Sequence, residues 1–220
     1  MRTIVAALAG YFIGTIPSAD IAARLASRRR RIPSDLRDVG TGNPGALNAA
    51  KTLGWRWGAL VLAGDIGKGV LASVIGRRIG GANRAYAAGT ASVVGHCAPV
   101  WSGFRGGKGV ATSAGTSLVC FPAYAPADIG LATALTALSR GRGEIATCVT
   151  SAVFVLAATY WWATGRENAW GPKATVGLPL YALASSALII YRFVTAPPPD
   201  AAAVPLAAAE TGAIPEEALA

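Results

Sequence analysis

The residues of this chain best suited to chemistry lie in one basic, glycine-rich turn. Gly106, Gly107 and Gly109 surround Lys108, and an apolar run begins at Val110. Glycines let a ligand approach the backbone closely. If a helix begins at Val110, its first amide groups have no carbonyl partner and carry the positive end of the helix dipole. Together with the Lys108 ammonium, this arrangement favours an anion, most commonly a phosphate group.

A second glycine-rich segment, GTGNPGALNAAK, covers Gly40–Lys51. Its Asn43 and Pro44 predict a short helix that starts at Pro44 with Asn43 as its cap. The segment is either a second anion-binding loop, with the Thr41 hydroxyl and the Lys51 ammonium as donors, or an ordinary turn between helices. Neither glycine-rich segment is a Walker A loop, because the GxxxxGKS/T spacing is absent from both.

Other ionisable residues fall inside or beside apolar segments. Asp65 and Lys68 stand three residues apart in GDIGKG, so on a helix they neutralise each other. Ionisable residues within a membrane segment mark a functional site by default, and we expect this pair to support or orient a substrate. His96 is the only histidine, and we expect its ring to bond a loop carbonyl in preference to a phosphate. Asp20 and Arg24, four residues apart, are expected to pair on one helix face.

Several reaction classes lack their residues in this sequence. No GxSxG motif is present, and the single histidine leaves no plausible Ser-His-Asp set. The histidine-x4-aspartate signature of the better-known glycerolipid acyltransferases is also absent, since Trp101 stands five residues after His96. The three cysteines are scattered without metal-ligand spacing, and we predict neither a metal nor a cofactor. Chemistry here would rest on positioning and charge stabilisation instead of a protein base.

The composition predicts that these residues are positioned by membrane helices. The chain is 53% hydrophobic and 14% charged, whereas soluble domains have about 25% charged residues. Its apolar residues form blocks separated by short basic or Gly/Pro-rich breaks, which is typical of an all-α polytopic membrane bundle. About seven transmembrane helices are predicted, over Thr3–Ala26, Trp55–Ile75, Arg84–Val100, Val110–Cys120, Tyr124–Leu138, Ile145–Ala163 and Thr175–Val194.

Prolines interrupt two parts of this layout. Pro17 is expected to kink or interrupt the first segment. The fourth and fifth segments are shorter than the roughly 20 residues that a membrane span requires. They form a helical hairpin, a re-entrant pair or one kinked span around Pro122 and Pro126.

Basic loops orient the predicted bundle. Arg28–Arg31 follow the first segment directly, so the positive-inside rule places this loop in the cytoplasm, the N-terminus outside and the C-terminus in the cytoplasm. Arg77, Arg78 and Arg84 fall on the opposite side, against the rule.

The net charge limits the class of partner, and the composition of the C-terminal residues indicates where the membrane domain ends. The net charge of +9 lies in short loops between spans, which favours contact with membrane lipids and argues against nucleic acid. Residues 195–220 are rich in proline and alanine, and we predict a disordered cytoplasmic tail after a membrane domain of residues 1–194. The oligomeric state is not predicted.

Three ordered motifs, GTGNPGALNAAKTLG, GDIGKG and GHCAPVWSGFRGGKGVAT, resemble the acyl-phosphate-dependent glycerol-3-phosphate acyltransferases of bacteria, the PlsY family. The resemblance covers about Gly14 to Gly115. It implies a seven-helix enzyme of the bacterial plasma membrane, using neither acyl-CoA nor a metal. Such an enzyme transfers an acyl group from acyl phosphate to the 1-hydroxyl of sn-glycerol 3-phosphate and forms lysophosphatidic acid, with a substrate phosphate assisting deprotonation.

The resemblance assigns roles to individual residues. Thr41 stands where the family usually has serine, Lys51 where it usually has arginine, and Lys108 matches the family lysine; these three are the expected catalytic residues. The expected substrate-binding residues lie in the same three motifs and are Gly42, Asn43, Gly45, Asn48, Asp65, Lys68, His96, Gly106, Gly107, Gly109 and Thr112.

The sequence departs from the family pattern at the end of the last helix. The family typically has a histidine-arginine-x-asparagine-isoleucine motif there, whereas this chain reads IIYRFVTAPPP and keeps only Arg192. We therefore carry two hypotheses, of which the first is favoured: an active acyltransferase with a modified site. The second is a non-catalytic membrane paralogue that binds phosphorylated ligands or lipids, or that partners an active homologue. A transporter ranks third, since no internal repeat is present.

Overall fold

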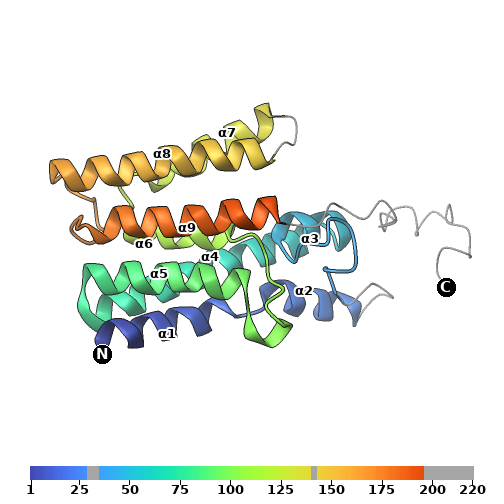
Figure 1. The fold of residues 1–220 in the computed structure, drawn as a ribbon. Helices are drawn as coiled ribbons and strands as arrows, with labels where there is room; N and C mark the ends of the chain where they lie inside the picture. Colours follow the sequence, from blue (N-terminus) through green and yellow to red (C-terminus); the bar gives the residue numbers. More distant parts are fainter. Residues whose placement is uncertain (29–34, 140–142, 196–220) are drawn as a thin grey trace, which may run out of the picture. The chain divides into compact units, whose positions relative to one another are not determined.

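Every described element of the chain is helical, which confirms the all-α prediction. The structure is a computed structural model, and it describes residues 1–28, 35–139 and 143–195. Within these residues the chain forms α1 (Arg2–Gly14), α2 (Ser18–Ser27), α3 (Ala46–Thr52), α4 (Trp55–Gly80), α5 (Ala82–Cys97), a 3₁₀ turn (Val100–Ser102), α6 (Val110–Cys120), α7 (Ala125–Leu138), α8 (Gly143–Thr164) and α9 (Gly177–Val194) (Figure 1).

The described helices divide into two compact units. Unit 1 contains Met1–Ile16 and Asp65–Thr195, and the described part of unit 2 lies within Pro17–Gly64. Helix α4 begins in unit 2 and continues into unit 1. Each unit is considered separately below.

In the part of the chain that the structure describes, four helical segments are long and apolar enough to cross a membrane. They are Arg2–Ser27, Trp55–Gly80, Gly143–Thr164 and Gly177–Val194. Helices α6 and α7 are apolar but shorter, and a turn at residues 121–124 separates them into two helices instead of one kinked span. The count of seven spans and the orientation of the termini stay predictions. Most of the predicted tail lies outside the described residues, as do Arg29–Arg31.

Proline breaks the first apolar segment as predicted. Helix α1 ends at Gly14 and α2 begins at Ser18, with Pro17 as its N-cap residue. A proline has no N–H to donate and disfavours a helical residue before it. The carbonyl of Ile16 is consequently free to accept a bond from outside the helix, and it receives one from Lys68.

Glycines bring the backbones of α1 and α5 into direct contact. A Cβ on Gly10 or Gly14 of α1 would strike the backbone of Ala88 or Ser92 of α5. From the other side, a Cβ on Gly95 would meet the carbonyl of Tyr11. Small residues four apart allow this close approach in membrane helices, where dispersion contacts replace the hydrophobic effect as the driving force.

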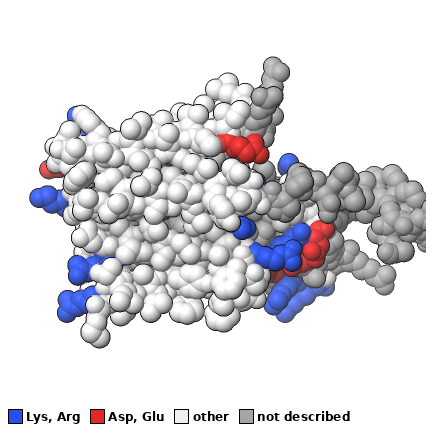
Figure 2. Space-filling model, in the orientation of Figure 1, with Lys and Arg blue, Asp and Glu red and all other residues white. Residues whose placement is uncertain are grey.

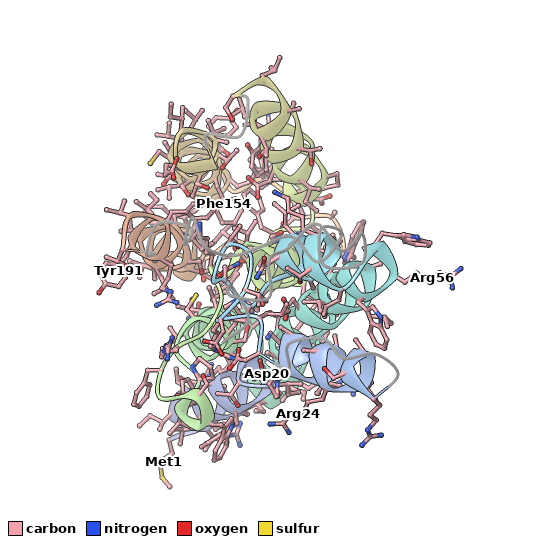
Figure 3. The ribbon with its side chains drawn as sticks, turned by 90° about the vertical axis from the view of Figure 1, so that its right-hand side faces the viewer. Met1, Asp20, Arg24, Arg56, Phe154 and Tyr191 are labelled. Carbon is pink, nitrogen blue, oxygen red and sulfur yellow. The ribbon has the colours of Figure 1, made fainter. Side chains whose placement is uncertain are left out.

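Besides the contact between α1 and α5, unit 1 has a core cluster of aromatic residues. Phe121, which is fully buried, packs against Phe154 of α8 and Tyr124, with ring centroids 6.0 and 5.4 Å away. The hydroxyl groups of Tyr181 and Thr116 lie 2.6 Å apart, so the buried phenol has a partner. In Figure 3, Phe154 lies among the helices while Tyr191 points outward.

Charged groups are sparse over the long faces of unit 1. Figure 2 shows an almost uncharged surface over α5, α8 and α9, with basic residues gathered at the end where α4 stops and α5 begins. The last turn of α4 carries Arg77 and Arg78, and the Arg77 guanidinium donates to the carbonyl of Trp170. An uncharged band between charged ends is the surface that a bilayer requires.

Unit 2 packs small residues of α2 against α3 and the start of α4. Ala19, Ala22, Ala23 and Ala26 are buried on one face of α2. They contact a cluster that includes Leu36, Ala49, Leu53 and Val61. This cluster holds the chain on both sides of the segment that starts at Gly40.

We expect Gly14→Leu to destabilise unit 1, because the added side chain would have to separate α1 from α5. Overpacking of a close contact typically costs about 1–3 kcal/mol. Thermal unfolding in detergent should show a lower midpoint for Gly14→Leu than for Gly130→Leu, since Gly130 lies on α7 with no atom within 4 Å of its Cβ position. Equal midpoints for the two variants would contradict the close packing of α1 on α5.

Candidate active site

The basic glycine-rich turn folds back onto the C-terminal end of α5. The amide of Gly106 donates to the carbonyl of Cys97, and that of Gly107 to the carbonyl of His96, both at 3.1 Å. A Cβ on Gly107 would strike the His96 ring. These glycines therefore provide close packing on α5, and their amides are already engaged in this structure.

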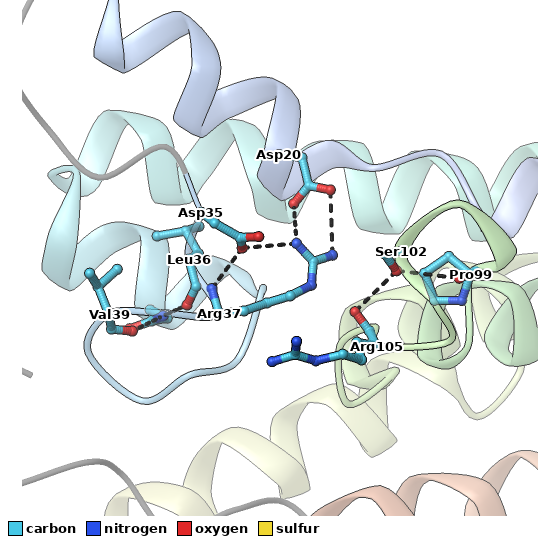
Figure 4. A network of polar contacts seen from close by, with 9 residues as sticks. Asp20, Asp35, Leu36, Arg37, Val39, Pro99, Ser102 and Arg105 are labelled. Atoms are coloured by element: carbon cyan, nitrogen blue, oxygen red, sulfur yellow. Dashed lines mark hydrogen bonds and ion pairs between the residues drawn. The ribbon is translucent and has the colours of Figure 1, made fainter.

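The preceding bend is held by its own backbone and side chains. The Ser102 hydroxyl contacts the carbonyls of Pro99 and Arg105 at 3.3 and 3.2 Å (Figure 4). Gly103 and Phe104 both have positive φ values, 59° and 65°. Such a conformation is uncommon for a phenylalanine, and it returns the chain toward α5.

Helix α6 begins at Val110, as the sequence predicts. Gly109 is its N-cap residue with φ 89°, a conformation that glycine adopts without strain. The Thr112 hydroxyl lies in the first turn and is fully buried, with no hydrogen-bond partner among the described residues. The helix therefore begins with unpaired amide donors next to Lys108, and its first turn also contains a buried hydroxyl without a described partner.

Lys108 is half-buried at this helix terminus. Its ammonium nitrogen lies 4.1 Å from the centroid of the Phe193 ring. Burial lowers the pKa of Lys108 below the usual 10.5, and the positive charge of Arg192 lowers it further, while Glu144 acts in the opposite direction.

Arg192, in the last turn of α9, binds the opposite side of the turn. Its Nη2 donates to the carbonyl of Gly106 at 2.6 Å, and its Nε to the carbonyl of Gly107 at 3.3 Å. The turn is thus fixed through its amides by α5 and through its carbonyls by α9. Sequence reasoning retained Arg192 as the remnant of a motif but did not predict these contacts, nor the contact of Phe193 with Lys108.

Asp65, Lys68 and His96 form one buried cluster in unit 1. Lys68 Nζ lies 2.9 Å from Asp65 Oδ1 and donates to the carbonyl of Ile16 at 3.0 Å. This confirms the predicted pair. His96 Nδ1 faces the same Asp65 oxygen at 3.5 Å, so the expectation that its ring bonds a loop carbonyl is wrong. The cluster links the break after α1 to the helix end on which the basic turn rests.

Asn48 organises the glycine-rich segment of unit 2. Its Oδ1 accepts from the Thr41 amide at 3.0 Å, and its Nδ2 donates to the carbonyls of Leu36 and Val39 at 2.9 and 3.0 Å. A Cβ on Gly40 would strike the Asn48 side chain. Asn48 is fully engaged within the protein, which makes it a positioning residue for the loop around Thr41.

Two local predictions in unit 2 are wrong. The N-cap of α3 is Gly45, with no side-chain hydrogen bond, so Asn43 does not cap the helix and Pro44 precedes it. The carboxylate of Asp20 pairs with Arg37 at 2.8 Å rather than with Arg24 (Figure 4). Tertiary contacts replaced the i,i+4 pair, because Arg37 also reaches Asp35 and can serve both carboxylates.

The remaining residues assigned to unit 2 differ in exposure. Lys51 is exposed in the last turn of α3, and Thr41, Gly42 and Asn43 are half-buried. Gly42, with φ 65°, needs the conformation that glycine provides. Unit 2 therefore presents a second glycine-rich loop with the Thr41 hydroxyl and the Asn43 amide. The short helix α3 follows this loop and carries Lys51 in its last turn.

Comparison with known proteins gives consistent matches. The family model described as glycerol-3-phosphate acyltransferase matches residues 4–196. The glycerol-3-phosphate acyltransferase of Thermoanaerobacter pseudethanolicus is 37% identical over 164 residues, which cover 74% of this chain and 79% of the relative. That of Alkaliphilus metalliredigens is 39% identical over 131 residues, 60% of this chain and 65% of the relative.

A solved structure is also similar over nearly the whole chain. It is the crystal structure of PlsY (YgiH), an integral membrane glycerol 3-phosphate acyltransferase, in its glycerol 3-phosphate form. The TM-score is 0.72 at 27% identity, and the match covers 96% of this chain and 94% of that one. The lysophosphatidic acid form of the same protein matches with a TM-score of 0.65 at 25% identity, over 87% of this chain and 88% of that one.

We expect that breaking the Asp65–Lys68 pair from one side costs more than removing both charges. Asp65→Asn leaves the Lys68 ammonium, whose side chain is 4% exposed, buried without a counter-charge. Such a change typically costs about 3–5 kcal/mol. Unfolding of Asp65→Asn, Lys68→Met and the double variant in detergent should show the double variant to be the most stable of the three. Additive losses would show that the two charges do not interact.

Proposed function

The chain belongs to the glycerol-3-phosphate acyltransferase family, and we propose that it transfers an acyl group from acyl phosphate to the 1-hydroxyl of sn-glycerol 3-phosphate. The product is lysophosphatidic acid, and inorganic phosphate leaves. The chain is a multi-pass membrane protein, and we propose the bacterial plasma membrane as its location.

One observation carries the proposal: the start of α6 brings Lys108 and free amide donors together, and among the described residues no carboxylate forms an ion pair with this lysine. This helix start combines the Lys108 ammonium with the unpaired first amides of α6. Thr112, in the first turn of the same helix, has a buried hydroxyl that lacks a partner among the described residues. A phosphate oxygen would satisfy the free amides, and the helix dipole adds to the attraction. Both proposed substrates carry phosphate.

The transfer needs charge stabilisation more than a protein base. The glycerol hydroxyl oxygen attacks the acyl carbon, the bond from that carbon to the phosphate oxygen breaks, and the departing phosphate takes up the hydroxyl proton. Lys108 and the α6 terminus would stabilise negative charge on phosphate as that bond breaks. His96 is buried and paired with Asp65, which supports a positioning role for its ring.

The second glycine-rich segment, in unit 2, supplies further groups that we propose to interact with phosphate. Thr41 and Lys51 are proposed as catalytic residues, and Gly42, Asn43 and Gly45 as residues that let phosphate approach the backbone. Asn48 holds this loop through three hydrogen bonds. Gly106, Gly107 and Gly109 are proposed to contribute to substrate binding through the shape of the first turn, because the amides of Gly106 and Gly107 already donate to α5. Asp65 and Lys68 support that turn from α4.

The alternative, a non-catalytic paralogue, has one observation in its favour. The end of α9 lacks the histidine and asparagine of the family motif, and Tyr191 there is 60% exposed. Removal of a preorganised donor commonly lowers the rate by about 10²–10³. A direct assay distinguishes the two functions.

We expect purified protein in detergent to convert labelled sn-glycerol 3-phosphate to lysophosphatidic acid with palmitoyl phosphate but not with palmitoyl-CoA. Lys108→Ala should lower this rate by about 100-fold or more, because it removes a full charge from the anion site. Lys173→Ala is the matched control, since Lys173 is an exposed lysine in the loop before α9. No product above that of folded Lys108→Ala would favour the non-catalytic paralogue.

On the alkaline side, the activity should fall at a lower pH than it would if Lys108 had the pKa of an ordinary lysine. Because the pKa of Lys108 is lowered, its ammonium loses the proton below the usual value of 10.5, and the catalytic charge is lost as the pH rises through the lowered pKa. Arginine keeps its charge throughout this range, so Lys108→Arg should move the alkaline limb of the pH–rate profile to higher pH. An unmoved limb, after subtraction of spontaneous acyl phosphate hydrolysis, would assign the titration to another group.

A further inference from the structure

The Lys108 ammonium rests on an aromatic ring instead of a carboxylate. Its nitrogen lies 4.1 Å from the Phe193 centroid, within the range of about 6 Å for a cation–π contact. Among the described residues, Lys108 makes no ion pair within 4.0 Å. The protein therefore holds the lysine without a carboxylate in direct contact, and Glu144 acts on its charge only from beyond 4.0 Å.

The ring itself is fixed by packing. Phe193 packs against an apolar cluster of Val93, Cys97 and Ile189, and its edge lies close to Gly143 at the start of α8. A Cβ on Gly109 would meet Cys97, Val93 and Ile189, so one cluster supports both the ring and the residue that follows Lys108. Arg192, the preceding residue of α9, binds the carbonyls of Gly106 and Gly107.

An aromatic ring suits a lysine that must bind phosphate. A free lysine side chain loses rotamer entropy when it is fixed, and a ring that restricts it beforehand reduces that loss on binding. The ring covers only one side of the ammonium and leaves N–H groups for phosphate oxygens. A carboxylate at the same place would compete with the phosphate for the charge.

We propose that Phe193 is a positioning residue that holds Lys108 ready to bind a substrate phosphate group. The inference rests on the proposed function in that the bound group is the phosphate of sn-glycerol 3-phosphate or of acyl phosphate. Phe193 takes no part in bond making or breaking. The ring changes how well Lys108 is ordered before phosphate binds and leaves its charge in the bound complex unchanged, so its effect belongs to binding and passes through Lys108.

We expect Phe193→Leu to raise the KM for one of the two phosphate substrates by about 3- to 10-fold, the size of a partly buried cation–π contact, with kcat changed less than about 2-fold. Varying sn-glycerol 3-phosphate and palmitoyl phosphate separately identifies which phosphate Lys108 meets. Phe193→Tyr, which keeps the ring face, should restore the KM of the unchanged chain. Unchanged KM values for both substrates in Phe193→Leu would overturn the inference.

Stepwise fluorination of the Phe193 ring separates charge attraction from shape. Fluorine withdraws electrons from the ring face with little change of volume, so KM should rise with each added fluorine if the ring acts on the ammonium. A merely structural ring would give equal KM values throughout the series, and that result would contradict the proposal.

A double-variant cycle tests whether the effect passes through Lys108, independently of turnover. Inorganic phosphate should raise the unfolding midpoint of the unchanged protein, and Phe193→Leu should diminish this shift. In a Lys108→Met background, Phe193→Leu should have no further effect; an equal loss in both backgrounds would overturn the inference. If no lysophosphatidic acid forms, the proposed function fails, while this binding cycle still decides the role of Phe193.

Discussion

Two hydrogen bonds, from the amides of Gly106 and Gly107 to the carbonyls at the end of α5, determine where the basic turn lies. They require that no side chain stands between the turn and His96, which only glycine at position 107 permits. Arg192 binds the carbonyl side of the same peptides. With both sides of its peptide groups engaged, the turn has little freedom, and it delivers Lys108 and the first residues of α6 in a fixed orientation.

A buried cluster of Asp65, Lys68 and His96 supports the helix end on which this turn rests. Asp65 accepts from Lys68 and faces His96, and Lys68 also satisfies the carbonyl that the break at Pro17 leaves open. Unpaired charges at such depth would be costly, so each group of the cluster depends on the others. The cluster thereby ties α1, α4 and α5 together at the level of the turn.

Patterns among neighbouring residues in the sequence predicted much of the helical structure. They did not predict the contacts between residues far apart in the sequence. The apolar blocks predicted every long helix, and the start of α6 at Val110, because these features depend on neighbouring residues. The Asp65–Lys68 pair was predictable for the same reason. Asp20 binds Arg37 across 17 positions and Lys108 meets Phe193 across 85, and no sequence periodicity reports such distances. The cap at Gly45 was missed because Asn and Pro also favour turns.

The close contact of α1 with α5 connects an exposed apolar helix face to the helix end on which the basic turn rests. Ile4, Val5, Leu8 and Phe12 form an exposed apolar face on α1, while its glycines lie directly on the α5 backbone without an intervening layer of side chains. Two helices in backbone contact are expected to tilt together, since no flexible side chains lie between them that could rearrange. We therefore expect a change in the tilt of α1, such as a change in bilayer thickness produces, to be transmitted to the end of α5 on which the basic turn rests.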